Sequence, residues 1–336
     1  MAEPIAVDKW LGLIRSEYLG GFVRNGGAAV RFVVTPSHSA KLRFSERLRS
    51  EAEAEEYLCV TVDSAATRVH MIDKVFNAVA AQVDWRRLAR GFLSRVLTEA
   101  HYVVPQEAQP FGLRPLAEMN GCQEQVMRVI VNKRLQDSVA LDYRMTQEYR
   151  FAMTWLCLEQ LDPGEVPAGL TDRICEWLVG TLRLVSTLKK SLIFQKVGRH
   201  NGRDMLFSLA RWLHKCGKSG LVLVMDIGAV VVPPRSRSEE RIRYSASAVL
   251  DTYEALRQFV DSTGELGHTM VFILVPPEFV DESERRSVYA YNALRYRALT
   301  EVRDRKIQNP LASLVVLDGD GDLALTMGTG EGTNGR

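Results

Sequence analysis

The chain has 336 residues, 46% of them hydrophobic and 25% charged, with a formal net charge of +2. These values are typical of a globular protein of one large domain or two, and so small a net charge gives no overall attraction to nucleic acid or anionic membranes. The N-terminal residues lack the features of a signal peptide, and no apolar run is long enough to span a bilayer. Five scattered cysteines without C-x-x-C spacing favour reduced thiols and a cytoplasmic location.

Short apolar runs separated by helical patterns follow one another along the chain. The expected strands are 29–34, 57–62, 221–225, 269–275 and 314–317. The expected helices are 7–22, 41–56, 69–83, 84–99, 203–216, 241–262 and 283–303, and the stretch from 112 to 202 reads as helical almost throughout. Apolar strands that alternate with helices predict an α/β fold, in which helices cover both faces of a parallel sheet.

The helical middle of the chain reads as an insertion between the second and third strands. The predicted organisation is an N-terminal half of the sheet domain over 1–83, a helical insertion over 84–202, a C-terminal half of the sheet domain over 203–325, and a disordered glycine-rich tail over 326–336.

The segment Arg31 to Leu42, RFVVTPSHSAKL, has the order of a P-loop: strand, short polar loop, lysine, helix. When G-x-x-x-x-G-K-[ST] is aligned on Lys41, Thr35 and Ala40 stand at the glycines and Leu42 at the hydroxyl residue. The glycines normally let backbone N–H groups approach the phosphates, and the hydroxyl holds Mg²⁺. Two interpretations stay open: an altered nucleotide site, or an ordinary strand–loop–helix with a chance lysine.

A second candidate site is LVLVMDIG, Leu221 to Gly228, an apolar strand that ends in an aspartate. This is the Walker B form, whose aspartate helps to hold Mg²⁺ at the carboxyl end of a parallel strand. Hydrolytic members usually follow it with a glutamate that orients water, and this chain has Ile227. Asp226 could equally be a plain turn residue. The fourth strand ends in Val275, Pro276 and Pro277, which offer no side-chain donor for sensing a γ-phosphate.

The segment 181–220 is strongly basic, with one acid, Asp204, and nine cationic residues: Arg183, Lys189, Lys190, Lys196, Arg199, Arg203, Arg211, Lys215 and Lys218. It could contact the phosphates of a nucleic acid or face an acidic partner. It could also be a solvated helix face whose acids lie opposite in space.

No metal site is expected. The late motif DGDGD, with Asp318, Asp320 and Asp322, resembles the start of an EF-hand loop, but Leu323 and Thr329 stand where that loop needs glycine and glutamate. We predict a turn there, and the six histidines form no recognisable ligand set.

Three stretches of the chain resemble the P-loop ATP-binding proteins of bacteriophage-exclusion (BREX) defence systems. They are Tyr18 to Val34, Leu206 to Asp226, and Val271 to Glu282 followed by Tyr291 to Arg297. Their order and separation extend the resemblance over roughly residues 8 to 318. It implies an AAA-like P-loop NTPase fold, with Lys41 as the Walker A lysine, Asp226 as the Walker B aspartate and Arg297 as a late arginine that could reach a neighbour's γ-phosphate.

The chain departs from this family where phosphate, magnesium or water is positioned, namely at Thr35, His38, Ala40, Leu42, Ile227, Val275 and Pro276. The remaining candidates are Asp226 and Arg297 for catalysis, and Lys41, Thr35, His38 and Ser39 for nucleotide binding. We therefore predict a non-catalytic scaffold or accessory protein that needs no cofactor, with ATP and Mg²⁺ bound without efficient hydrolysis as an open alternative.

The expected partner is another protein, such as an active ATPase or a DNA-processing subunit, and nucleic acid could bind through 181–220. Two other functions stay open: a weak or atypical ATPase in a DNA-processing or defence complex, and an accessory or regulatory protein of a specialised metabolic pathway.

Overall fold

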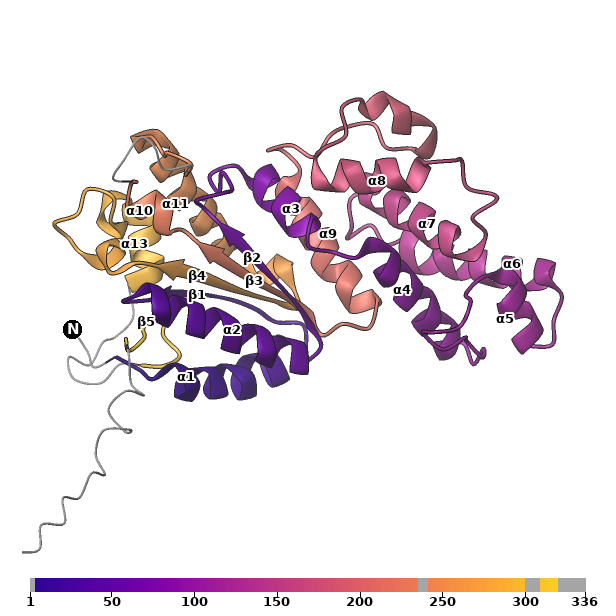
Figure 1. Ribbon diagram of the computed structural model, residues 1–336, viewed down its shortest axis with the longest axis horizontal. Coiled ribbons are helices and arrows are strands. Elements are labelled where there is room, and N and C mark those ends of the chain that lie inside the picture. The colour runs from indigo at the N-terminus through magenta and orange to yellow at the C-terminus, as the bar shows by residue number, and fades with distance from the viewer. Residues whose placement is uncertain (1–3, 235–240, 300–308, 320–336) are drawn as a thin grey trace, which may run out of the picture.

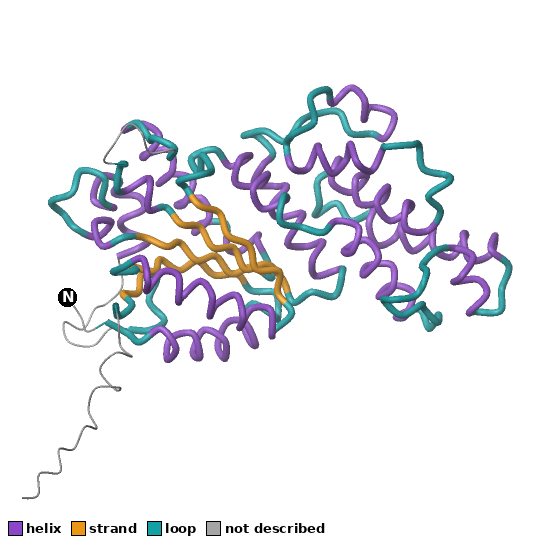
Figure 2. The backbone as a smooth tube through the Cα atoms, in the orientation of Figure 1, coloured by secondary structure: helices purple, strands orange, loops and turns teal. Residues whose placement is uncertain are grey.

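The computed structural model describes residues 4–234, 241–299 and 309–319. Its centre is one five-stranded sheet in the order β2-β3-β4-β1-β5, with every strand parallel to its neighbours (Figures 1 and 2). The strands are β1 (Ala28–Val34), β2 (Tyr57–Asp63), β3 (Gly220–Asp226), β4 (Thr269–Val275) and β5 (Leu314–Val316). The sequence prediction of a parallel α/β fold is confirmed, and this topology is consistent with a P-loop ATPase.

Helices cover both faces of the sheet because side chains alternate along each buried strand. One face carries Val33, Val224 and Phe272, and it is covered by α1 (Val7–Ile14), a π-helix over Arg15–Phe22 and α2 (His38–Ala54). Trp10 and Phe44 reach from α1 and α2 to within 6.0 Å and 5.7 Å of the Phe272 ring, measured between ring centroids.

The second face of the sheet belongs to the larger of the two hydrophobic clusters. Here lie α3 (Ile72–Ala80), α9 (Gly202–Lys215), α10 (Gly228–Val231), α11 (Ala246–Asp261), α12 (Thr263–Leu266) and α13 (Asn292–Leu299). Phe279, in the 3₁₀ turn Pro277–Val280 after β4, stacks on Phe32 of β1 with ring centroids 5.9 Å apart.

Some predicted helices have other limits in the structure. The helix expected from 41 begins at His38, and the one expected from 241 begins at Ala246, because Ser37 and Ser245 act as N-caps and accept hydrogen bonds from backbone N–H groups in the first turn. The helix expected over 283–303 is wrong at its start. A turn held by Asp281 and a short 3₁₀ segment, Val288–Ala290, precede α13, and residues 300–303 lie outside the described residues.

Between β2 and β3 the chain forms a body of helices beside the sheet, as predicted (Figure 1). We call residues 85–191 the helical module. It contains α4 (Trp85–Glu99), α5 (Leu113–Met119), α6 (Glu124–Leu135), the π-helical turn Gln136–Ala140, α7 (Gln147–Leu161), α8 (Leu170–Val179) and the 3₁₀ segment Val185–Ser191.

The helices α3 and α9 join this module to the sheet. They cross so closely at Gly202 that a Cβ there would lie 2.9 Å from the backbone nitrogen of Asp73. Asn77 of α3 also donates a hydrogen bond of 3.0 Å to the carbonyl of Leu178 at the end of α8.

The outer edge of β2 is closed by a side chain. The amide of Gln82 accepts a hydrogen bond from the Thr61 N–H (3.2 Å) and donates one to the Thr61 carbonyl (2.9 Å). An unpaired strand edge is a template for association, and Gln82 removes that template at the middle of β2.

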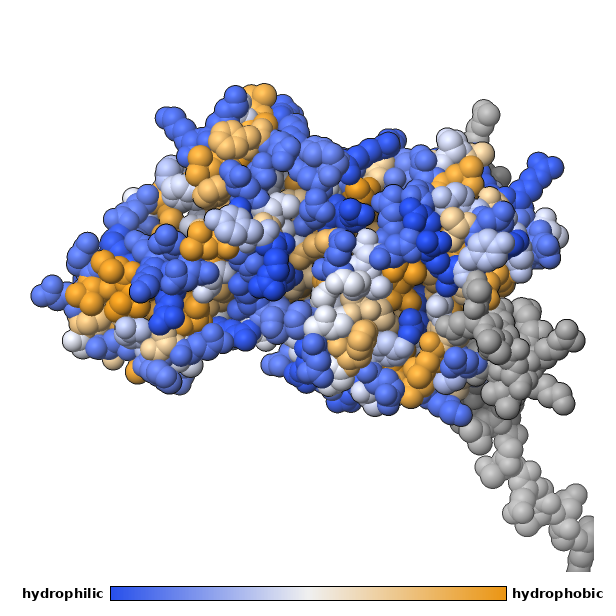
Figure 3. Space-filling model, turned by 180° about the vertical axis from the view of Figure 1, so that it is seen from behind, coloured by the Kyte–Doolittle hydropathy of each residue, from blue (hydrophilic) through white to orange (hydrophobic). Residues whose placement is uncertain are grey.

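The surface is polar over most of the face seen in Figure 3, and hydrophobic residues gather at the end of the helical module farthest from the sheet. Val126 and Val129 of α6 are 48% and 61% exposed, and Met119 at the end of α5 is also exposed. Among the described helices, none is long and apolar enough to cross a membrane. The predicted disordered tail lies outside the described residues.

Candidate functional site

Lys41 and Asp226 meet at the carboxyl edge of the sheet. Asp226 ends β3, and Lys41 lies in the helix that follows β1. Because all strands are parallel, the loops that follow β1 and β3 emerge at the same edge. The Nζ of Lys41 lies 2.7 Å from Oδ2 of Asp226, and the two side chains are 29% and 12% exposed. The two residues singled out in separate sequence motifs are thus in direct contact.

The connection between β1 and α2 is short. Only Thr35, Pro36 and Ser37 separate Val34, the last residue of the strand, from His38, the first of the helix. The hydroxyl of Ser37 accepts a hydrogen bond of 3.1 Å from the Ala40 N–H. Lys41 therefore lies beyond the first turn of α2, and its own N–H donates to the Ser37 carbonyl (3.1 Å) within the helix.

The other predicted nucleotide-binding residues differ in accessibility. Thr35 is buried, and its N–H donates to the Val275 carbonyl at 3.0 Å, which ties the start of the loop to the end of β4. His38 and Ser39 are exposed on the first turn of α2, and the Ser39 hydroxyl lies 2.9 Å from that of Ser37. Leu42, at the position of the usual magnesium-binding hydroxyl, is 47% exposed.

Both carboxylate oxygens of Asp226 accept hydrogen bonds from neighbouring groups. Oδ2 contacts Lys41, and Oδ1 accepts a hydrogen bond of 2.8 Å from the Gly228 N–H. The next residue, Ile227, is fully buried in the larger hydrophobic cluster, and its N–H donates to the Leu274 carbonyl (3.0 Å). Ile227 is thus a core residue on the sheet side of the loop.

Sequence reasoning missed a buried network that supports this loop. Ser64 directly follows β2; its N–H donates to the Asp226 carbonyl (2.8 Å) and its hydroxyl accepts from the Ala229 N–H (3.1 Å). Tyr244 donates its hydroxyl proton toward the Ser64 carbonyl (2.9 Å), and Arg286 donates to the Tyr244 carbonyl (2.9 Å). The sequence offers one signal for this network: Ser64, a small polar residue, directly follows Asp63, the aspartate that ends β2.

Arg297 is held in another part of the molecule. It lies on α13 and forms a two-pronged ion pair with Asp261, the last residue of α11, with Nη2 at 2.9 Å from Oδ2. Because α11 starts after the carboxyl end of β3 and ends before the amino end of β4, Asp261 lies toward the opposite edge of the sheet from Asp226. Arg297 is therefore not part of the Lys41–Asp226 pair of its own chain.

A family model for the BREX system ATP-binding protein BrxC/D matches residues 20–320. The chain belongs to the BREX system ATP-binding protein BrxC/D family. It is thus a member of a component family of a multi-protein phage-defence system. Comparison with curated proteins and with solved structures gave no significant match. The matched range includes the Lys41 loop, Asp226 and Arg297.

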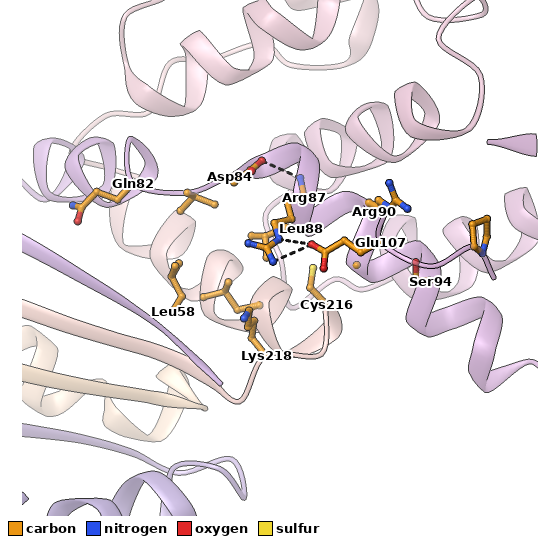
Figure 4. A pocket seen from close by; sticks show the side chains of 14 residues that line it. Leu58, Gln82, Asp84, Arg87, Leu88, Arg90, Ser94, Glu107, Cys216 and Lys218 are labelled. Atoms are coloured by element: carbon orange, nitrogen blue, oxygen red, sulfur yellow. Dashed lines mark hydrogen bonds and ion pairs between the residues drawn. The ribbon is translucent and has the colours of Figure 1, made fainter. Parts of the chain in front are cut away.

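This BrxC/D-family chain also has a cavity of about 530 Å³ between β2, α4 and the end of α9 (Figure 4). Its walls are mainly apolar. Two of its charged side chains are used internally, since Arg87 pairs with Glu107 at 2.9 Å and Arg90 donates to the carbonyl of Gln106 (2.7 Å). Burial raises the pKa of the Cys216 thiol well above its ordinary value, so this thiol is protonated and unreactive at neutral pH.

Within the described ranges, no three side chains of His, Cys, Asp or Glu gather where they could hold a metal ion. The N–H of Asp318 donates a hydrogen bond of 3.0 Å to the Ile5 carbonyl, and residues 320–322 of the DGDGD motif lie outside the described residues.

Proposed function

We propose that this chain is a non-hydrolysing member of the BREX ATP-binding family, which keeps the ATPase-like frame in order to bind a partner protein. The observation that carries the proposal is the connection of three residues between β1 and α2. A P-loop needs several residues with free N–H groups between strand and helix to enclose phosphates. Here the helix begins early, and Ser37 caps the Ala40 N–H.

The donor set also favours this proposal. The Lys41 ammonium is neutralised by Asp226, whose second oxygen is taken by the Gly228 N–H. Leu42 offers no oxygen to Mg²⁺, and Ile227 is buried where hydrolytic members carry a water-orienting acid. These residues do not fit a Mg–ATP complex, so no hydrolytic step is assigned to them.

A partner protein is supported by the apolar end of the helical module. Contiguous exposed apolar surface marks interaction sites more often than isolated hydrophobic residues do. Met119, Val126 and Val129 supply such a surface, and α5 and α6, which carry them, pack on one another.

Calorimetric titration with Mg–ATP, together with an assay of phosphate release, tests the proposal. We expect no binding at micromolar concentrations and no phosphate release above that of a buffer control. Micromolar Mg–ATP binding that disappears in Lys41→Ala would overturn it and favour the atypical ATPase, in which a neighbour's Arg297 would complete the site.

A further inference from the structure

Most cations of the basic segment 181–220 have no acidic partner among the residues that the structure describes. Arg211 and Lys215 contact the buried carboxylate of Asp142 at 2.5 Å and 3.0 Å. Within the described ranges, no carboxylate lies within 4.0 Å of the other seven cations, Arg183, Lys189, Lys190, Lys196, Arg199, Arg203 and Lys218. Among the described residues, an acid therefore lies directly against Arg211 and Lys215 but against none of the other cations of this segment.

Five of these cations form what we call the basic strip: Lys189, Lys190, Lys196, Arg199 and Arg203. The strip follows the 3₁₀ segment Val185–Ser191 and the loop that leads into α9. The first four side chains belong to exposed residues, and the Arg203 guanidinium lies 5.9 Å from the centroid of the Phe207 ring. Of the acids close by, Glu148 accepts a hydrogen bond from Gln195 (3.0 Å), and exposed Asp204 is the acid that lies on the strip's own loop and helix.

The strip has a hollow of about 280 Å³ at its α9 end, lined by Arg199, His200, Arg203 and Asp204 together with residues of α3 and α11. Positive charge continues beyond it toward the loop between β2 and α3. Burial lowers the pKa of His70 in that loop, and the charges of Arg199 and Arg68 lower it further, partly offset by Asp251 and Asp73. Arg199 and Arg68 therefore both lie near His70, together with the acids Asp251 and Asp73.

The sequence of the strip also includes an exposed aromatic residue. Phe194 is 50% exposed and lies between Lys190 and Lys196 in sequence, and Leu192, two residues before it, is 43% exposed. Cations that follow a phosphate backbone, combined with an aromatic face on which a base can stack, are the usual recognition elements for single-stranded nucleic acid. An acidic peptide would use the cations and leave the Phe194 face without a planar partner.

We infer that the basic strip binds single-stranded nucleic acid, with its lysines and arginines on the phosphates and Phe194 stacked on a base. This binding needs no nucleotide at Lys41, so the inference does not rest on the proposed function. A chain that hydrolyses ATP would still bind through the strip, and a chain that does not bind nucleic acid could still be a non-hydrolysing scaffold.

Fluorescence anisotropy with a labelled 20-nucleotide oligo-dT, without ATP and at several KCl concentrations, tests the inference. The charge-reversal variant Lys189→Glu/Lys190→Glu/Lys196→Glu should weaken binding about tenfold or more at 100 mM salt. It should also reduce the slope of log affinity against log salt by about 2, since each phosphate contact on a single strand contributes roughly 0.7. Phe194→Ala should weaken binding about fivefold or more, through the loss of stacking.

The matched control, Lys9→Glu/Lys133→Glu/Arg134→Glu, changes the net charge equally at exposed sites away from the strip, and it should bind within about twofold of the parent chain. Equal weakening in this control would overturn the strip as the site. Unchanged binding in the strip variant would do so as well, as would a lack of binding at 50 mM salt. Unlabelled polyglutamate can be compared with unlabelled oligo-dT as a competitor of the labelled oligonucleotide. If polyglutamate displaces the labelled strand at the same concentration of charges as oligo-dT does, nucleic acid is overturned as the ligand in favour of an acidic protein.

Discussion

The carboxyl edge of the sheet and the basic strip differ in whether their cations are paired with acids. At the sheet edge, Lys41 lies against Asp226. The neighbouring loops are fixed by hydrogen bonds that the hydroxyls of Ser37 and Ser64 accept and that the Gly228 N–H donates. On the strip, five cations lie without a carboxylate in contact among the described residues. A site that binds a polyanion needs charge that the protein has not already neutralised.

This difference supports the inference that phosphate groups bind at the strip. The P-loop-like order of the sequence predicts a phosphate site at Lys41, whose ammonium is paired with Asp226, whereas no carboxylate among the described residues contacts the cations of the strip. The predictions below change one region or the other, and each states which result would remove the contrast.

The largest effect is expected at Ile227. Ile227→Glu introduces the acid that usually follows the Walker B aspartate in hydrolytic P-loop ATPases, but it places a carboxylate in a fully buried position. We expect a loss of about 4 kcal/mol in the free energy of unfolding, measured by urea denaturation. Ile227→Leu, a volume-conserving control, should lose less than about 1.5 kcal/mol. If Ile227→Glu were stable and hydrolysed ATP, the carboxyl edge of the sheet at Lys41 and Asp226 could support catalysis, and the contrast with the strip would be lost.

The second-largest effect is expected at Asp142. This acid pairs with Arg211 and Lys215, whereas no carboxylate among the described residues contacts the other cations of the basic segment. Although burial raises its pKa, hydrogen bonds from Lys215 and Arg144 lower it overall. A lowered folded-state pKa stabilises the protein above the ordinary aspartate value near 4, and this contribution is lost as the pH falls below it. Asp142→Asn should cost about 2–3 kcal/mol at pH 7 and flatten the acid limb of a stability–pH curve.

The strip variant is the control for that measurement. Reversal of Lys189, Lys190 and Lys196 should change the free energy of unfolding by less than about 0.5 kcal/mol, because these side chains are exposed and have no acidic partner among the described residues. A large loss there would mean that the strip is structural, and the contrast between the two regions would disappear.

The Lys41–Asp226 contact can be measured by a double-mutant cycle with Lys41→Met and Asp226→Asn. We expect a coupling energy of about 1–2 kcal/mol for this half-buried pair. The exposed Arg47–Asp8 pair, with side chains 55% and 48% exposed, should give about 0.3 kcal/mol in the same assay. Zero coupling at Lys41 would mean that its charge is free for a ligand, as on the strip.

A smaller loss of stability than at Ile227 or Asp142 is expected at the start of α2. Ser37→Ala removes the N-cap and should cost about 1 kcal/mol in chemical denaturation. Ser39→Ala, one position inside the helix, should cost a few tenths of a kcal/mol, since its side chain is exposed. If the two variants were equally stable, the early start of the helix, and with it the argument against a phosphate-binding loop, would lose its support.

The strands could be predicted from the sequence because each is an apolar run bounded by breakers, and observed limits differ from predicted ones by a residue or so. The helix α2 begins earlier than expected because Ser37, three residues before Ala40, caps it, and a helix predicted to start at Lys41 leaves out this capping signal. The contact between Lys41 and Asp226, residues 185 positions apart, followed in outline from parallel topology. The Ser64–Tyr244 network could not be predicted, because neither residue belongs to a recurring pattern and both act through backbone groups.

The close crossing of α3 and α9 has a mechanical consequence. At Gly202 the two helices touch with no room for a side chain, and Asn77 ties α3 to α8 in the module. The chain enters α3 from the loop that holds the Asp226 carbonyl through Ser64, and it leaves α9 directly into β3, which ends at Asp226. The helical module is thus joined to the sheet by two helices in close contact, and the second of them leads into the strand that ends at Asp226. We expect a partner that displaces the far end of the module to shift this strand as well.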